Sequence, residues 1–246
     1  MTQYFFVGGN PKSGTTWMQL LLDAHPAITC SGEGHFIDRL LAGMFKVREE
    51  YNKQLRIDAE RVFQGKPFYG PLANGVLLPV ARELIINLMS QRATAESQWI
   101  GDKTPANNLF FNDLRTMFPS ALFINIVRHP YDVTVSRLHH GLRAGRHDAL
   151  DPASETHLSM VRAAAQAWLH GQERVARFHA RHPEQLLQVH YEDALAEPHE
   201  TAARLFSFLG ASAEAEIVDA AVKASAFEAL TRLIHADDGM LACACG

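Results

Sequence analysis

Residues 9–17 of the chain read GNPKSGTTW, and they connect a short apolar run at residues 4–7 to an amphipathic segment at residues 15–24. An apolar run that passes through a glycine-containing turn into a helix-like segment is typical of a buried strand followed by a helix. In such a turn, several backbone N–H groups converge at the positive end of the helix dipole. The pattern therefore predicts a phosphate-binding loop. The alternative is an ordinary strand-to-helix turn with polar capping residues.

This loop differs from that of the nucleoside-triphosphate enzymes in the position of its lysine. In those enzymes the lysine follows the second glycine, and the next Ser or Thr holds magnesium. Here Thr15 follows Gly14, and the lysine, Lys12, stands two positions before that glycine. The cation is thus moved to the crest of the loop, where it can reach a bridging oxygen or a transferring group. The sequence therefore disfavours phosphoryl transfer of the kinase type, which also needs a magnesium-binding Asp at a strand end.

Further apolar runs predict a parallel sheet. Residues 122–127 and 186–189 end abruptly in polar positions and are followed by helix-like segments, and residues 99–101 are a candidate fourth strand. Additional helices are expected over residues 107–118, 130–143, 155–181 and 198–209. Such βαβ units predict an α/β protein with a single-domain, three-layer, P-loop-like fold, in which helices flank a central, mainly parallel β-sheet.

The composition is that of one folded domain over residues 1–246. The chain has 47% hydrophobic residues, 20% charged residues and a net charge of -4, which gives no sign of a nucleic-acid partner. An odd number of cysteines and the lack of an apolar run of about 18 residues favour a cytoplasmic protein without a membrane partner. Residues 45–75 are polar and are expected to form a substrate-covering insertion, and residues 236–246 a loose tail.

Three later segments carry residues that suit an anionic ligand. Arg128 closes one predicted strand and Ser136 lies eight positions further along, so a turn and a helix can bring both to one phosphate. The alternative for Arg128 is an ion pair with Asp132. Lys103 stands at the end of the candidate fourth strand, in GDKTPAN, where the alternative is a solvated lysine. Tyr191 follows the last apolar run, in VHYED.

Taken together, these motifs resemble those of the PAPS-dependent sulfotransferase family, bacterial members included; PAPS is 3'-phosphoadenosine 5'-phosphosulfate. The resemblance implies that Lys12, Ser13, Gly14, Thr15 and Thr16 bind the 5'-phosphosulfate of PAPS as co-substrate. It implies that Arg128 and Ser136 bind the 3'-phosphate, and that Trp17 and Tyr191 contact the adenine. Lys12 would stabilise charge on the bridging oxygen and Lys103 on the sulfuryl group. Tyr191 could equally be a buried anchor for the helix that follows it.

Sulfuryl transfer also needs a base that takes the proton of the acceptor. Two candidates, Glu33 and His35, follow the helix that leaves the loop. Residues 23–35 resemble the tyrosylprotein sulfotransferases around their catalytic glutamate, and the resemblance places Glu33 on that residue. Pro105 stands where small-molecule sulfotransferases carry their catalytic histidine, which also favours Glu33. His35 is the second candidate, and a plain surface carboxylate is the alternative for Glu33.

The sequence thus predicts in-line transfer of a sulfuryl group from PAPS to a hydroxyl or amine of a small-molecule, glycan or peptidyl acceptor, with release of 3',5'-adenosine bisphosphate (PAP). Two alternatives stay open: a P-loop-like nucleotide-binding or kinase-related protein, and a catalytically silent binding protein with a sulfotransferase fold. The paired histidines at 139–140 and 179–182 lack the spacing of a hydrolytic zinc site, so no metal is expected. A homodimer is one possible assembly. Nothing after residue 227 matches the Arg-Lys-Gly element with which many cytosolic sulfotransferases complete the 3'-phosphate site.

Overall fold

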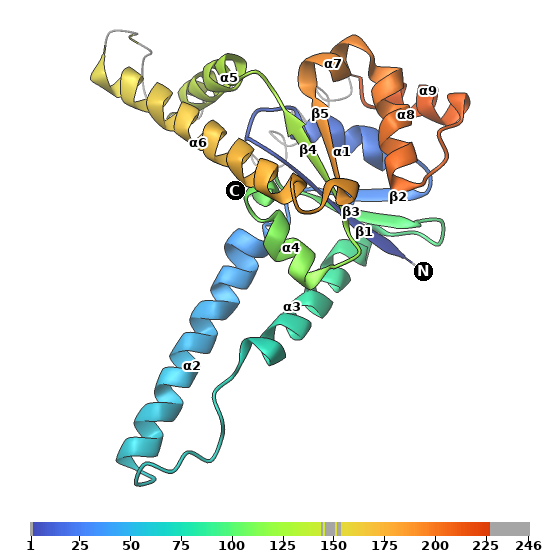
Figure 1. Cartoon of the computed structure of the whole chain (residues 1–246). Helices are drawn as coiled ribbons and strands as arrows, with labels where there is room; N and C mark the ends of the chain where they lie inside the picture. Colours follow the sequence, from blue (N-terminus) through green and yellow to red (C-terminus); the bar gives the residue numbers. More distant parts are fainter. Residues whose placement is uncertain (1, 144, 146–150, 152–153, 227–246) are drawn as a thin grey trace, which may run out of the picture.

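The protein is an α/β structure built on one parallel sheet (Figure 1). The computed structural model describes residues 2–143, 145, 151 and 154–226. Its five strands lie in the order β2-β3-β1-β4-β5, and each adjacent pair is parallel. Their bounds are β1 Gln3–Gly9, β2 Ile28–Ser31, β3 Trp99–Lys103, β4 Leu122–Val127 and β5 Leu186–His190. The parallel α/β fold predicted from the sequence is confirmed.

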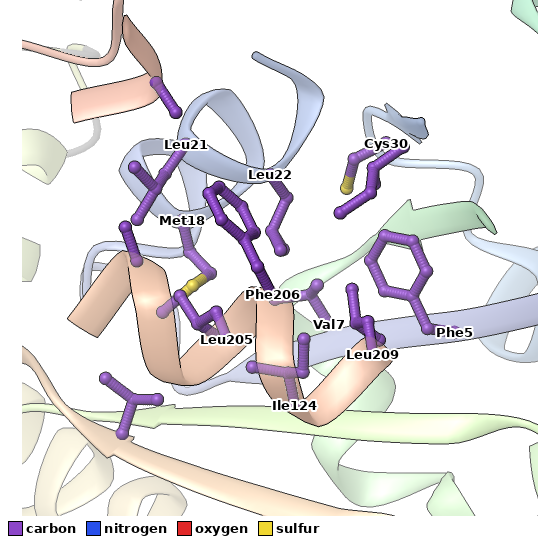
Figure 2. Close-up of a cluster of buried hydrophobic side chains, with 14 of the residues drawn as sticks. Phe5, Val7, Met18, Leu21, Leu22, Cys30, Ile124, Leu205, Phe206 and Leu209 are labelled. Atoms are coloured by element: carbon purple, nitrogen blue, oxygen red, sulfur yellow. The ribbon is translucent and has the colours of Figure 1, made fainter. Parts of the chain in front are cut away.

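Both faces of the sheet are covered by helices, which explains why the strands read as unbroken apolar runs. On one face, β1 directs Phe5 and Val7 toward α1 (Thr15–Asp23), α8 (Pro198–Leu209) and α9 (Ala215–Ala224). Figure 2 shows Phe206 of α8 packed among Met18, Leu21 and Leu22 of α1. Because side chains alternate along a strand, Phe6 of β1 points to the opposite face.

On that second face, Phe6 packs with apolar residues of α3 (Asn74–Met89), α4 (Phe111–Met117) and α6 (Glu155–His179). The helix α5 (Pro130–Arg143) lies against α6, and the short α7 (Tyr191–Ala196) follows β5 directly. Among the described residues there are also four short helical turns: η1 Phe36–Leu41, η2 Ser90–Arg92, η3 Pro105–Leu109 and η4 Pro183–Gln185. The helix predicted at 155–181 is present as α6 with slightly different ends, whereas the segment predicted as one helix at 107–118 is divided into η3 and the shorter α4.

Residues 45–75, predicted as an insertion, include most of α2 (Ala42–Arg61), which projects from the sheet beside the diverging α3 (Figure 1). The helical pattern of α2 is weak because Ala59 is its one buried residue, so no apolar stripe marks it in the sequence. In α3, an interior Pro79 obscures the pattern, since proline disfavours a helix interior. The substrate-covering role of this region stays a prediction, and residues 236–246 lie outside the described part of the chain.

The topology brings the predicted functional residues to one edge of the sheet. Lys12 follows β1, Glu33 follows β2, Lys103 ends β3, Arg128 follows β4 and Tyr191 follows β5. In a parallel sheet the carboxyl ends of all strands lie along the same edge, where ligands of open α/β sheets bind. Residues that are far apart in the sequence are therefore neighbours in space.

Candidate active site

The loop between β1 and α1 has a tightly constrained backbone. Lys12 and Gly14 have left-handed conformations, with φ of 79° and 93°. Glycine is required at position 14, because a Cβ there would lie 2.4 Å from the ring of Tyr191. A lysine with positive φ is uncommon and must be held by its surroundings. Since α1 begins at Thr15, the free N–H groups of its first turn belong to this loop.

A cavity of about 640 Å³ lies over the loop. Its volume falls in the range of small-molecule sites. The predicted residues that line it are Lys12, Gly14, Thr15, Thr16, Trp17, Glu33, His35, Arg128, Ser136 and Tyr191. Two further predicted residues are buried behind this lining: Ser13 is fully buried, and Lys103 is 3% exposed. The structure therefore brings all the sequence motifs to one site, together with His140, which the sequence analysis considered only as a metal ligand.

Arg128 joins the phosphate loop to the second anion motif. Its Nη1 donates to the backbone oxygen of Lys12 at 3.3 Å, and its guanidinium lies 4.7 Å from the centre of the Tyr191 ring. In the described part of the chain it forms no ion pair with Asp132, which was the alternative. Its Nε is buried and has no hydrogen-bond partner among the described residues. A buried cationic donor of this kind suits an anionic ligand.

Positive charge gathers on this side of the cavity. Burial lowers the pKa of Lys12, and the charges of Arg143 and Arg128 lower it further. A bound anion would reverse this effect, because an opposite charge favours the protonated amine. The three cations thus favour a phosphate-bearing or sulfate-bearing ligand over a neutral one.

An ion pair joins β3 to the segment after β2, and one of its members lines the cavity. Lys103 Nζ lies 2.9 Å from Glu33 Oε1. The lysine side chain is 4% exposed, whereas that of Glu33 is 45% exposed and lines the cavity. Burial raises the pKa of Glu33, but its hydrogen bond with Lys103 and the charges of Lys103 and His35 outweigh burial, so its pKa lies below the ordinary value. Glu33 is therefore ionised at neutral pH and is able to accept a proton.

Asp102 fixes the segment that carries Glu33. This carboxylate is 1% exposed and accepts hydrogen bonds from the Gly34 N–H at 2.9 Å, the Thr104 hydroxyl at 2.9 Å and the Asn107 amide at 3.0 Å. Burial raises the pKa of Asp102, and these hydrogen bonds oppose that rise. The segment after β2 is thereby tied to β3, the strand that ends in Lys103. The sequence shows Asp102 next to Lys103, but it does not show that the carboxylate holds Gly34.

His35 stands beside Glu33 and has a second acidic neighbour. Its Nε2 lies 3.4 Å from Glu33 Oε2, and its Nδ1 lies 2.8 Å from Asp38 Oδ2. Asp38 belongs to the short helix η1, and sequence reasoning missed it. The only sequence signal is that Asp38 lies three positions after His35, and such a spacing does not identify a partner by itself.

One face of α6 holds both anion-binding motifs in place. Asn10 of the phosphate loop donates its amide N–H to the Ala167 backbone oxygen at 3.1 Å and accepts from Gln172 Nε2 at 3.1 Å. Between these positions, Trp168 donates its indole N–H to the backbone oxygen of Arg128 at 3.0 Å. The helix thus sets the spacing between the two motifs, which the sequence places more than a hundred residues apart.

The fold and the site define a P-loop-like α/β protein with a cavity, lined by Lys12 and Arg128 among others, at the carboxyl edge of its sheet. Comparison with protein families is more specific, because residues 5–215 match the model of the Sulfotransferase family. The chain belongs to this family.

Known relatives include protein-tyrosine sulfotransferases. The chain is 25% identical to Protein-tyrosine sulfotransferase 1 of Danio rerio over 204 residues, which cover 83% of this chain and 52% of that protein. It is 28% identical to Protein-tyrosine sulfotransferase 1 of Homo sapiens over 123 residues, which cover 50% of this chain and 30% of that protein. The chain thus spans about half or less of the length of these relatives.

Solved structures share the fold. The sulfotransferase domain from the curacin biosynthetic pathway has a TM-score of 0.56 at 20% identity and covers 88% of this chain and 77% of its own. A sulfotransferase from Alicyclobacillus acidocaldarius has a TM-score of 0.56 at 19% identity, and the match covers 87% of this chain and 83% of that one. Mouse sulfotransferase SULT7A1 complexed with PAP has a TM-score of 0.52 at 15% identity, and the match covers 92% of this chain and 65% of that one. At these identities, the likeness is one of fold.

Across residues 2–143, 145, 151 and 154–226, no group of three or more His, Cys, Asp or Glu side chains lies close enough to hold a metal ion. Among the helices of the described residues, none is both long and apolar enough to cross a membrane.

Proposed function

We propose that the chain transfers a sulfuryl group from PAPS to a hydroxyl or amine of an acceptor by in-line displacement and releases PAP. The observation that carries this proposal is the ion pair between buried Lys103 and Glu33, because Glu33 lines the same cavity as the phosphate loop and Arg128. A charge-stabilising lysine, a carboxylate base and two anion-binding motifs are the groups that such a transfer requires.

The donor side of the cavity suits a ligand with anionic groups at two ends. Lys12, Ser13 and the first turn of α1 would hold the 5'-phosphosulfate, and Arg128 with Ser136 would hold the 3'-phosphate. Trp17 and Tyr191 line the same cavity and offer aromatic faces for an adenine. A similar fold in mouse SULT7A1 complexed with PAP supports this donor. No metal enters this scheme, because Lys12, Lys103 and Arg128 supply the positive charge.

On the acceptor side, Glu33 would act as the base. Its pKa is low in the absence of donor because Lys103 holds it. When Lys103 instead contacts the sulfuryl oxygens, Glu33 loses that hydrogen bond, its pKa rises, and it becomes a stronger base. In the same step, Lys103 would stabilise the charge that develops on the sulfuryl group and would no longer hold Glu33 in the ion pair. The resemblance of residues 23–35 to the tyrosylprotein sulfotransferases supports Glu33 in this role. The names of the relatives suggest tyrosine-containing peptides as one acceptor class.

A thermal-shift comparison tests the donor. PAP should raise the melting temperature, because a ligand that binds the native state alone stabilises it by mass action. ATP with magnesium should raise it less, since Lys12 stands at the crest of the loop and Thr15 takes the position of the triphosphate lysine. Greater stabilisation by ATP with magnesium would contradict the proposal and favour the kinase-related alternative.

A transfer assay then separates an enzyme from a silent binding protein. PAPS is incubated with phenols, steroids, sugars, amines and tyrosine peptides, and both PAP and sulfated product are measured. Acceptor-dependent release of PAP is the expected result. Stabilisation by PAP without transfer to any acceptor would favour the silent binding protein.

A further inference from the structure

The side chains of Lys103, Glu33, His35 and Asp38 form one continuous line of charged and titratable groups. Lys103 contacts one oxygen of Glu33, Oε1, at 2.9 Å, and His35 Nε2 faces the other oxygen, Oε2, at 3.4 Å. The second ring nitrogen of His35 lies 2.8 Å from Asp38 Oδ2. The base of the proposed reaction therefore has a histidine–carboxylate pair directly behind it.

This arrangement is held by the backbone and is not a chance surface contact. His35 has a left-handed conformation with φ of 47°, which is uncommon for a residue with a side chain. Its N–H donates to the Thr104 hydroxyl at 3.2 Å, and the preceding Gly34 N–H donates to buried Asp102 at 2.9 Å. Strained conformations of this kind persist where surrounding contacts fix them, often at functional sites.

Exposure increases from the histidine to the carboxylates on either side of it. The His35 side chain is 19% exposed, that of Asp38 is 28% exposed, and that of Glu33 is 45% exposed. His35 is thus covered more than the two groups it joins. Because Asp38 is partly exposed and contacts His35, a proton that reaches His35 has a route to water.

We infer that His35 is a proton relay behind Glu33, and that Asp38 is the positioning residue that sets its tautomer. This inference rests on the proposed function and adds to it the fate of the proton. Asp38 accepts a hydrogen bond from Nδ1–H, which leaves the lone pair of Nε2 directed at Glu33.

The acceptor oxygen or nitrogen forms its bond to sulfur as the bond from sulfur to the 5'-phosphate oxygen breaks, and that oxygen leaves with the electron pair. The acceptor proton passes to Glu33. Rotation of the carboxyl group about its broad terminal torsion presents this proton to Nε2 of His35. The imidazolium, stabilised between two carboxylates, then returns the proton to water, and Glu33 is ready for another cycle.

Other charged or titratable groups belong to the same site. Lys103 and Asp102 belong to β3, Lys12 belongs to the phosphate loop, and Arg128 and His140 line the same cavity. None of these is a second histidine–aspartate pair beside Glu33. In the His35–Asp38 pair, Nε2 of His35 lies opposite Oε2 of Glu33, the oxygen that Lys103 does not contact.

The test compares variants of the full chain in sulfuryl transfer across pH. Because general base catalysis contributes about 10²- to 10⁴-fold, Glu33→Gln should lose that much in kcat. We expect His35→Gln to lose about 10-fold in kcat, to keep its KM for PAPS, and to show a changed acidic limb in its pH profile. Asp38→Asn should show a smaller loss of the same kind. The double variant should fall no lower than His35→Gln alone, because the two residues act as one unit.

A matched pair elsewhere in the fold provides the control. His199 Nε2 lies 3.4 Å from Asp219 Oδ1 on α8 and α9, far from the cavity lining. His199→Gln and Asp219→Asn should leave the rate and the pH profile unchanged. Stabilisation by PAP confirms that each variant is folded. A rate of His35→Gln equal to wild type would overturn the relay, as would a loss as large as that of Glu33→Gln, which would make His35 the base.

A readout that does not depend on turnover is the nitrogen NMR spectrum of His35. In the PAP-bound wild type we expect Nδ1 of His35 to carry the ring proton that is donated to Asp38, and in Asp38→Asn a shift toward the Nε2–H tautomer. A proton on Nε2 in the wild type would contradict the inference. If the wild type bound PAP but transferred nothing, the proposed function would fail, whereas transfer with unaffected His35 and Asp38 variants would refute the relay alone.

Discussion

Glu33 and Lys103 lie 2.9 Å apart although seventy residues separate them in the sequence, and each is held by a different strand end. Lys103 is buried at the end of β3, and Glu33 follows β2, which is paired with β3. The ion pair therefore depends on the order of strands in the sheet. It places a fixed positive charge against the group that we propose as the base.

Replacing Lys103 should change both the rate and its pH dependence. In Lys103→Met, the hydrogen bond and charge that lower the pKa of Glu33 are removed, so this pKa rises. Because the base must be ionised, the acidic limb of the kcat/KM profile should move to higher pH, and the rate should fall about 100-fold or more through lost charge stabilisation. This effect is measured as the pH profile of kcat/KM for PAPS at saturating acceptor. An unmoved acidic limb would mean that Glu33 does not control the rate.

Replacing Gly14 should destroy donor binding. In Gly14→Ala, the new Cβ would lie 2.4 Å from the Tyr191 ring, on a backbone with φ of 93°. We expect a loss of about 1–3 kcal/mol in the free energy of unfolding and little thermal stabilisation by PAP. Gly65→Ala is the matched control, because its φ is 81° but nothing lies within 4 Å of the added Cβ. That variant should be less stable but should still bind PAP, and equal PAP responses of the two variants would argue against the loop as the donor site.

Replacing Arg128 should remove recognition of the 3'-phosphate. In Arg128→Met, the buried donor next to the cavity is lost. Hydrogen bonds to charged groups contribute about 1.5–3 kcal/mol, so PAP should bind about 10- to 100-fold more weakly. Adenosine 5'-phosphate, which lacks the 3'-phosphate, should bind with almost unchanged affinity. Titration calorimetry with both nucleotides distinguishes loss of the 3'-phosphate contact from a general loss of folding. Arg162→Met, at an exposed position on α6, is the control and should bind PAP like the wild type.

Weakening the contact of α6 with Arg128 should lower donor affinity without changing the chemistry. Trp168→Phe keeps the aromatic packing but removes the indole N–H that binds the Arg128 backbone oxygen. Loss of one hydrogen bond of about 0.5–1.5 kcal/mol should raise the KM for PAPS about 2- to 10-fold and leave kcat near wild type. Leu169→Ala, at the next and exposed position, is the control. A fall in kcat with unchanged KM would mean that α6 acts on the reacting groups instead.

The parts of the fold that could be predicted from the sequence are those with a strong local pattern. Strands β1 and β4 are buried on both faces and therefore read as continuous apolar runs. In contrast, β2 is a four-residue strand, ITCS, whose pairing with β3 supplies what its sequence lacks. The polar α2 and the proline-containing α3 lack the periodicity that marks a helix.

In the candidate site, too, residues in local motifs could be predicted, and residues placed by contacts between distant segments could not. The phosphate loop, Arg128 and Lys103 lie in contiguous motifs and could be found from sequence. Asp38 could not, because its contact with His35 depends on a left-handed backbone at that histidine. The sequence favours Glu33 over His35 only through a resemblance, because the contact of Glu33 with Lys103 is set by pairing between strands.

The rate of sulfuryl transfer by Glu33→Gln in a single turnover tests the central claim most directly. The substitution keeps the size of the side chain and its place on the cavity wall, but it removes the carboxylate. Enzyme saturated with PAPS is mixed with an acceptor on which the wild type is active, and sulfated product is followed in time. We predict a rate about 10²- to 10⁴-fold below wild type together with full stabilisation by PAP. A near wild-type rate from Glu33→Gln would contradict the account.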